Sequence, residues 1–119
     1  MIGAECFRVE QSGDIMIVRI VDTRDFDTDN YTQLQLDLVD FVDRRKPRKL
    51  LVDLGNIQYC STALTNTLLL AQKRMNAWTG QMKLFGLSEV VLETLHRLRL
   101  VGTLFSVYAD ETDAKQACA

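Results

Sequence analysis

The chain has few of the residues from which metal sites and disulfide frameworks are built, with one histidine and three cysteines among 119 residues. Cys6, Cys60 and Cys118 are odd in number and widely spaced, which argues against a disulfide framework and against a zinc site. We expect all three to be reduced thiols. We also expect the protein to need no metal ion and no cofactor.

Residues that several classes of enzyme require are missing as well. The sequence has no G-x-S-x-G elbow and no glycine-rich phosphate loop. A Ser-His-Asp arrangement could use only His96, which we expect to face solvent without a catalytic role. Cys60 has no sequence neighbour that would activate its thiol. We therefore expect a protein that is not an enzyme, with a nucleophile at Cys60 or Thr62 as a minor alternative.

Long apolar runs and a strong net charge are also absent. No run approaches the roughly 20 residues that span a bilayer, and the start MIGAECFRVE lacks the pattern of a secretion signal. The net charge of −2 gives no electrostatic reason to expect nucleic acid. The one basic cluster, RRKPRK at 44–49, is better explained as a solvated helix end and connector than as a nucleic-acid or anionic-lipid patch. These features predict a cytoplasmic protein without direct membrane insertion.

The remaining composition, 47% apolar and 25% charged, fits one globular domain that spans residues 1–119. The runs CFRVE and IMIVRI, joined by QSGD, predict an N-terminal hairpin. Helices and strands alternate after it. The predicted elements are a helix at about 29–45, a strand at 49–54, a helix at about 62–79, a strand in QMKLFGL, a helix capped by Ser88, a strand in LFSVYA and a closing helix at 110–118. We expect Val91, Leu95 and Leu98 to line the buried face of the helix that Ser88 caps.

This order predicts an α/β fold with a mixed sheet of four to five strands and helices packed on it. The hairpin would be antiparallel and the later strands parallel. Functional sites in such sheets tend to lie at the carboxyl ends of the parallel strands. Ser61 and Thr62 follow the predicted central strand and stand at such an end.

The acidic stretch DTRDFDTDN suggests a calcium loop, because Asp25, Asp27 and Asp29 alternate as the first ligands of an EF-hand do. Asn30 and Leu36 stand where that loop needs its glycine and its bidentate glutamate. We therefore interpret the stretch as a solvated loop that caps the first helix.

The hydroxyl pair at Ser61 and Thr62 has two explanations that the residues alone leave open. A serine or threonine before a helix caps its free amides. Two hydroxyls exceed the need for one cap, and the start of a helix is also a favourable place for a phosphate. Capping alone and capping with modification therefore both remain possible.

Helical spacing predicts which face of the 62–79 helix is buried. Leu64, Leu68, Ala71, Met75 and Trp78 form one apolar stripe, which we expect to share a core with Leu51. At about 100° per residue, a second set then turns outward. This outward set is Thr65, Asn66, Leu69, Lys73 and Asn76, with Leu70 beside it.

The stretches LLVDLGNIQYCSTALTNTLLLAQKR and GQMKLFGLSEVVLETLHRLRLVGTLFSVYADETDA resemble the STAS domain of anti-sigma factor antagonists. The upstream GDIMIVRI and FDTDNYTQLQLDLVDFV are similar to the second strand and first helix of that family. The resemblance extends from about Phe7 to Ala117. It depends on the order of elements and the apolar pattern more than on identical motifs.

The resemblance implies a protein-interaction domain that binds a kinase-like anti-sigma factor and is switched by phosphorylation. The family's acceptor hydroxyl follows an aspartate, and Thr62 falls on the acceptor while Ser61 falls on the aspartate. Ala63 replaces the family's second serine, and Leu64 and Asn66 replace two glycines.

These differences leave a second possibility, in which the domain is an accessory STAS subunit of a membrane transporter or signalling scaffold without phosphorylation. The predicted partner surface comprises Ser61, Thr62, Thr65, Asn66, Leu69 and Lys73. The sequence leaves the oligomeric state open.

Overall fold

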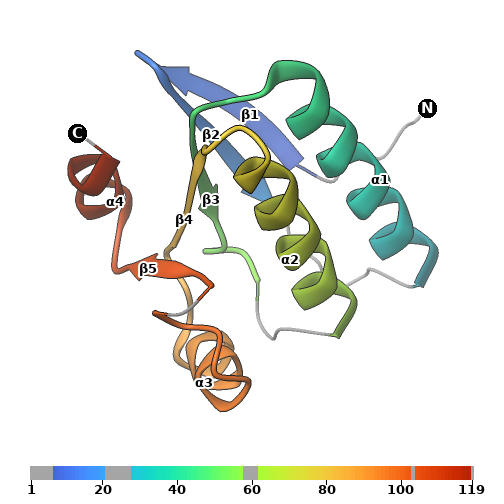
Figure 1. Cartoon of the computed structure of the whole chain (residues 1–119). Helices are drawn as coiled ribbons and strands as arrows, with labels where there is room; N and C mark the ends of the chain where they lie inside the picture. Colours follow the sequence, from blue (N-terminus) through green and yellow to red (C-terminus); the bar gives the residue numbers. More distant parts are fainter. Residues whose placement is uncertain (1–6, 21–27, 58–61, 103, 119) are drawn as a thin grey trace.

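The computed structural model describes residues 7–20, 28–57, 62–102 and 104–118, with the backbone alone for 28–32. Over these residues, five strands form one sheet in the order β1-β2-β3-β4-β5 (Figure 1). β1 and β2 are antiparallel, and each later strand runs parallel to its neighbour. The strands are β1 (Phe7–Ser12), β2 (Ile15–Ile20), β3 (Lys49–Asp53), β4 (Gln81–Phe85) and β5 (Ser106–Tyr108).

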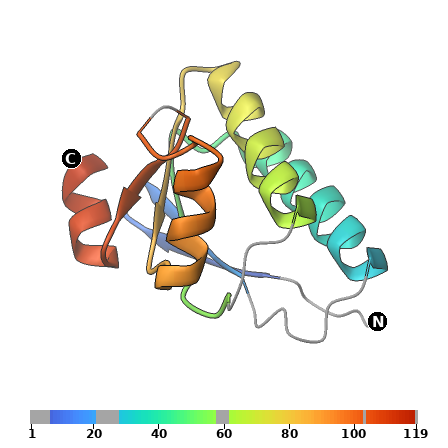
Figure 2. The same cartoon turned by 90° about the horizontal axis from the view of Figure 1, so that it is seen from below.

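Four helices in the described part of the chain cover the two faces of this sheet unequally. They are α1 (Thr28–Arg45), α2 (Thr62–Asn76), α3 (Glu89–Arg97) and α4 (Glu111–Cys118). Figures 1 and 2 show α1 and α2 side by side on one face and α4 on the other. The predicted α/β fold, with its mixed sheet and N-terminal hairpin, is therefore confirmed.

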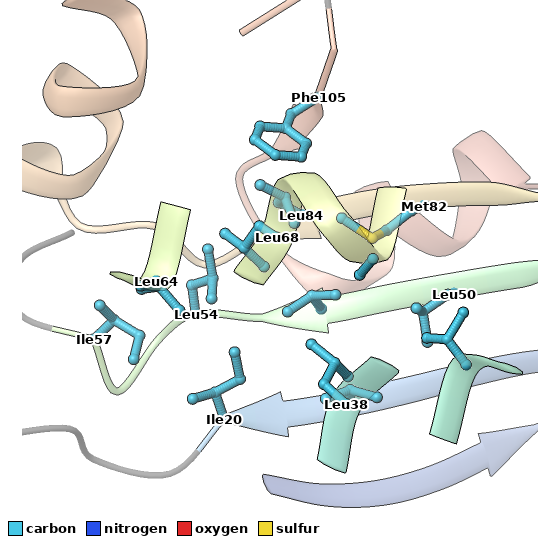
Figure 3. Packing of buried hydrophobic residues seen from close by; sticks show 14 of the residues in the cluster. Ile20, Leu38, Leu50, Leu54, Ile57, Leu64, Leu68, Met82, Leu84 and Phe105 are labelled. Carbon is cyan, nitrogen blue, oxygen red and sulfur yellow. The ribbon is translucent and has the colours of Figure 1, made fainter. Parts of the chain in front are cut away.

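The main core lies between the sheet and α1, α2 and α3. Leu64, Leu68, Ala71 and Met75 of the predicted stripe are 0% exposed in this core. Trp78, the last member of that stripe, lies beyond the end of α2 and is half-buried. Leu68 lies close to Leu84 of β4 in this core (Figure 3). Burial of these apolar side chains supplies most of the driving force for packing α2 on the sheet.

The prediction that Leu51 belongs to this core is wrong. Successive side chains of a strand point to opposite faces, so Leu50 and Val52 enter the main core and Leu51 faces α4. Leu51 shares a smaller cluster with Phe85 and Cys118. The apolar run of β3 is continuous because both faces of the strand are covered.

The prediction that α2 continues to Thr79 is also wrong, because the helix ends at Asn76. Thr79 takes the left-handed conformation (φ 56°), and the Gly80 amide donates to the Met75 carbonyl at 2.9 Å. Gly80 is needed for close packing, since a Cβ there would lie 2.7 Å from Met75 Cε and 3.0 Å from the Pro47 carbonyl oxygen. The turn that closes α2 therefore rests against the start of β3.

No helix among the described residues is long and apolar enough to cross a bilayer.

Candidate functional site

The carboxyl end of β3 directs the chain toward the first turn of α2. The Leu54 amide donates to the Phe85 carbonyl at 3.0 Å, and the Ile57 amide donates to the Leu54 carbonyl at 3.0 Å. Leu54 and Ile57 are buried, so the chain after β3 is anchored in the core on both sides of Gly55. Thr62 begins α2 at this same end of the sheet, where the parallel strands finish (Figure 1).

The first turn of α2 has one exposed hydroxyl and no carboxylate. Thr62 and Ala63 are exposed, whereas Leu64 is fully buried. No acidic residue occupies this turn, so no side-chain charge there opposes the partial positive charge of the helix start. A negative group on Thr62 would therefore be favoured by the helix and repelled by no acidic residue of the turn.

A groove of about 410 Å³ extends from Thr62 between α2 and α3. Its lining residues carry no formal charge, and leucines from both sides contribute apolar walls. The residues are Thr62, Thr65, Asn66 and Leu69 of α2, Thr94 and Leu98 of α3, and Leu100. The groove can accept an apolar side chain of a partner, with hydroxyl and amide groups available for hydrogen bonds.

Local contacts of α3 fix the far wall of the groove. The Ser88 hydroxyl caps the helix by accepting from the Val91 amide at 3.3 Å, which confirms the predicted cap. Val91 and Leu95 are buried, as predicted. Leu98 does not continue their stripe, because α3 ends at Arg97 and leaves Leu98 52% exposed.

The predicted partner residues of α2 are only partly brought together. Asn66 is exposed and lines the groove with Thr62, and Leu69 lines it while also packing against the core. Thr65 does not turn outward, since it is 5% exposed, and it contributes to the floor of the groove. Lys73 is exposed in the last turn of α2 and does not line the groove.

Ser61, Cys60, Asp25 and Asp27 lie outside the described residues, so their predicted roles stay predictions. The side chain of Asp29 is likewise outside the described part.

Three residues of the groove were absent from the predicted surface, namely Thr94, Leu98 and Leu100. All three come from α3 or the turn after it, 32 to 38 residues beyond Thr62. An exposed leucine beyond the end of a short helix is the only sequence signal that could have identified them. That signal was hidden because Leu98 has the spacing of the buried stripe.

His96 is exposed, as predicted, and lines a different groove of about 450 Å³ between α3 and β5. That groove contains mostly apolar side chains, including Leu92 and Val107. Among the described residues, no cluster of His, Cys, Asp or Glu is suited to a metal ion.

A charged cluster on the opposite face of the sheet holds α4 in place. Arg19 of β2 donates to Asp53 at 2.8 Å and to Glu111 of α4 at 2.6 Å, and it also pairs with Glu10 of β1. Hydrogen bonds from Arg19 lower the pKa of Glu10 and of Glu111, and the pKa of Arg19 is raised in return. On the same face, burial raises the pKa of the thiol of Cys118, the last residue of α4, which disfavours the reactive thiolate form.

Comparison with known proteins places this architecture in a family. The STAS domain model matches residues 7–114. A sequence search of curated proteins gave no match.

Three solved structures are similar in fold. An anti-sigma factor antagonist (STAS) domain protein from Planctomyces limnophilus is 18% identical with a TM-score of 0.81, covering 93% of this chain and 96% of that chain. An anti-sigma factor antagonist from Mycobacterium paratuberculosis is 18% identical with a TM-score of 0.78, and the match covers 93% of this chain and 91% of that chain. The phosphorylated form of the Bacillus cell fate determinant SpoIIAA is 12% identical with a TM-score of 0.67, and the match covers 95% of this chain and 99% of that chain. Because the family model covers nearly the whole chain, this protein belongs to the STAS domain family and has the fold of its anti-sigma factor antagonists.

Proposed function

We propose that the protein is an anti-sigma factor antagonist that binds a kinase-like anti-sigma factor through the groove between α2 and α3. The unmodified protein would capture the anti-sigma factor and release the sigma factor, and phosphorylation of Thr62 would reverse this. The role is binding in the cytoplasm and not catalysis. The observation that carries the proposal is the exposed Thr62 hydroxyl at the mouth of an uncharged groove.

The burial of Leu64 supports Thr62 as an acceptor for a kinase. Leu64 stands where typical family members have a glycine, and a larger side chain there could have obstructed the approach to the hydroxyl. Leu64 is 0% exposed and points into the core, so its side chain does not block the approach of a kinase to Thr62. Ala63, the exposed neighbour, is small.

The groove gives phosphorylation a physical means of weakening a complex. A phosphate adds about −1.5 to −2 charges at the edge of a surface whose lining residues are uncharged. An apolar partner group that closes over this edge would have to desolvate the phosphate. A penalty of about 3 kcal/mol would lower affinity roughly a hundredfold.

Recovery of partners from a native lysate with the tagged chain, followed by mass spectrometry, tests the partner class. A kinase-like anti-sigma factor supports the proposal. A transporter ATPase or a large signalling scaffold would support the alternative of an accessory STAS subunit. A structure of the stressosome, described as a signal integration and transduction hub, is also similar in fold, with a TM-score of 0.71 at 15% identity.

Phosphosite mapping and binding then test the acceptor, with the recovered anti-sigma factor as probe. We expect phosphate on Thr62, none on the Thr62→Ala variant, and at least tenfold weaker binding by Thr62→Asp. Thr112→Asp is the matched control, because Thr112 is an exposed threonine on α4, across the sheet from the groove. Phosphate on Ser61 alone would show that the acceptor is misassigned. Equal losses of binding affinity in Thr62→Asp and Thr112→Asp would show that the groove does not mediate the effect of phosphorylation.

A further inference from the structure

The end of the domain opposite Thr62 carries half of the chain's basic residues. α1 and α2 both end there, and β3 begins there (Figure 1). Seven of the 14 lysines and arginines belong to these segments, and we call this surface the basic end. Its members are Arg44, Arg45, Lys46, Arg48, Lys49, Lys73 and Arg74.

Carboxylates neutralise only part of the basic end. The ion pairs are Arg44–Asp40 at 2.8 Å, Arg74–Asp43 at 3.4 Å and Lys49–Asp14 at 3.0 Å. The other four cations are exposed and form no ion pair with a described residue. These four are Arg45, Lys46, Arg48 and Lys73. A protein with a net charge of −2 thus has a strongly positive end.

A solvated helix end and connector, the role that we expected for residues 44–49, explains only some of these charges. Cations in the last turns of α1 and α2 interact favourably with the helix dipoles, which gives Arg45 and Lys73 a local function. Lys46 and Arg48 lie beyond the end of α1, in its connection to β3. The Lys46 amide still donates to the Val42 carbonyl at 2.8 Å, so Lys46 remains close to the free carbonyls of the helix end. The helix dipole acts only within the last turn, so Arg48 needs another explanation.

Contacts of Trp78 hold this connection against the end of α2. The Trp78 indole N–H donates to the Pro47 carbonyl at 3.0 Å, and the Lys46 ammonium lies 5.9 Å from the centre of the indole ring. The Gln81 amide also donates to the Arg48 carbonyl at 2.7 Å. The cations of the connection and those of both helix ends are therefore held at one end of a rigid unit.

We propose that the basic end binds the surface of an anionic lipid bilayer, with the groove at Thr62 directed away from the lipid. Clusters of four to eight lysines and arginines bind anionic lipid surfaces, and each cation raises the affinity about fivefold. The four cations that form no ion pair with a described residue would then raise the affinity for an anionic bilayer several hundredfold. None of the large exposed apolar side chains in the described residues, Val9, Leu36, Val90, Leu98 and Leu104, belongs to the basic end, so the interaction is adsorption without insertion.

A bilayer suits this surface better than an acidic protein does. Arg45, Arg48 and Lys73 are exposed and form no ion pair with a described residue. Long side chains of this kind adopt many rotamers, so they offer no fixed geometry to match fixed carboxylates. Lipid headgroups move laterally and can follow mobile cations. Trp78, half-buried at the same end, is also a residue type favoured at membrane interfaces.

Vesicle co-sedimentation of the full chain tests the proposal, with phosphatidylglycerol-containing vesicles and pure phosphatidylcholine vesicles as probes. The test variant carries Arg45→Gln, Arg48→Gln and Lys73→Gln, and keeps Lys46 because of its contact with Trp78. The matched control carries the same charge change elsewhere. Its substitutions are Arg8→Gln, Arg97→Gln and Arg99→Gln, at three exposed positions outside the basic end.

We expect binding to the anionic vesicles at low salt, little to the neutral vesicles, and a steep loss as salt is raised. The test variant should lose about a hundredfold in partitioning, and the control less than about threefold. Circular dichroism melts confirm that both variants are folded. The proposal is overturned if the wild-type chain does not bind the anionic vesicles, or if the test and control variants lose the same amount of vesicle partitioning. It is also overturned if polyglutamate or duplex DNA binds the chain as strongly as the vesicles do.

Discussion

Truncation of Leu68 and of its neighbour Leu69 to alanine should separate folding from partner binding. Leu68 is 0% exposed in the main core, so Leu68→Ala leaves a cavity that the surrounding side chains fill only in part. Substitutions of this kind cost about 2 to 5 kcal/mol. Because domains of this size have about 5 to 15 kcal/mol of total stability, the variant should unfold at clearly lower denaturant concentration.

Leu69→Ala should cost less stability than Leu68→Ala but should weaken partner binding directly. Leu69 is half-buried, packs partly against the core and lines the groove beside Thr62. We expect a stability loss of about 1 kcal/mol, because only part of the side chain is removed from an apolar environment. Binding of the anti-sigma factor should weaken by more than about 1 kcal/mol, roughly fivefold, because interfaces depend on a few apolar anchors.

Urea titration and a direct binding assay measure the two effects on the same samples. Leu36→Ala is the control, since Leu36 is 59% exposed on α1 and should change neither quantity by much. A loss below about 0.5 kcal/mol for Leu68→Ala would mean that α2 is rotated on the sheet. Wild-type affinity in Leu69→Ala would refute the groove as a partner site.

Three further substitutions test the packing that positions these surfaces. Arg19→Met should lower stability near pH 7. Arg19 lowers the pKa values of Glu10 and Glu111 from their ordinary 4.5, so the stability it provides is complete above that pH and is lost as the pH falls below it. The variant should therefore lose less stability than wild type between about pH 5 and pH 3 in pH-dependent melts. Gly80→Ala should cost about 1 to 3 kcal/mol in a denaturant titration, because its Cβ has no room. Ser88→Ala should cost about 1 kcal/mol in the same assay through loss of the cap, and an unchanged midpoint would contradict that role.

The order of elements follows from local patterns, which explains why it could be predicted. Period-2 and period-3.6 apolar spacing, the Ser88 cap and the polar hairpin connection are each encoded within a few residues. The face on which a strand residue lies is harder to predict when both faces are buried. Leu51 was misplaced for this reason, because an apolar run without alternation does not reveal which side chains face which helix.

The site was predictable only on the side contributed by α2. Thr62, Asn66 and Leu69 follow from one helix and its periodicity. Thr65 was misassigned because a helical wheel assumes a single buried face, whereas α2 is covered by the sheet and by α1 and forms the floor of a groove toward α3. The wall formed by Leu98 depends on tertiary packing that no local pattern records.

The two proposed surfaces lie at opposite ends of α2, and their separation predicts how they communicate. α2 has 15 residues, which at about 1.5 Å per residue places Thr62 roughly 20 Å from the end that carries Lys73. The Debye length at physiological salt is about 8 Å, so a phosphate on Thr62 is screened from the basic end. Thr62→Asp should therefore release the anti-sigma factor and leave partitioning onto phosphatidylglycerol vesicles within about twofold of wild type. A large change in partitioning would mean that the two ends are coupled through the fold, and the domain could then not remain on the membrane while it exchanges partners.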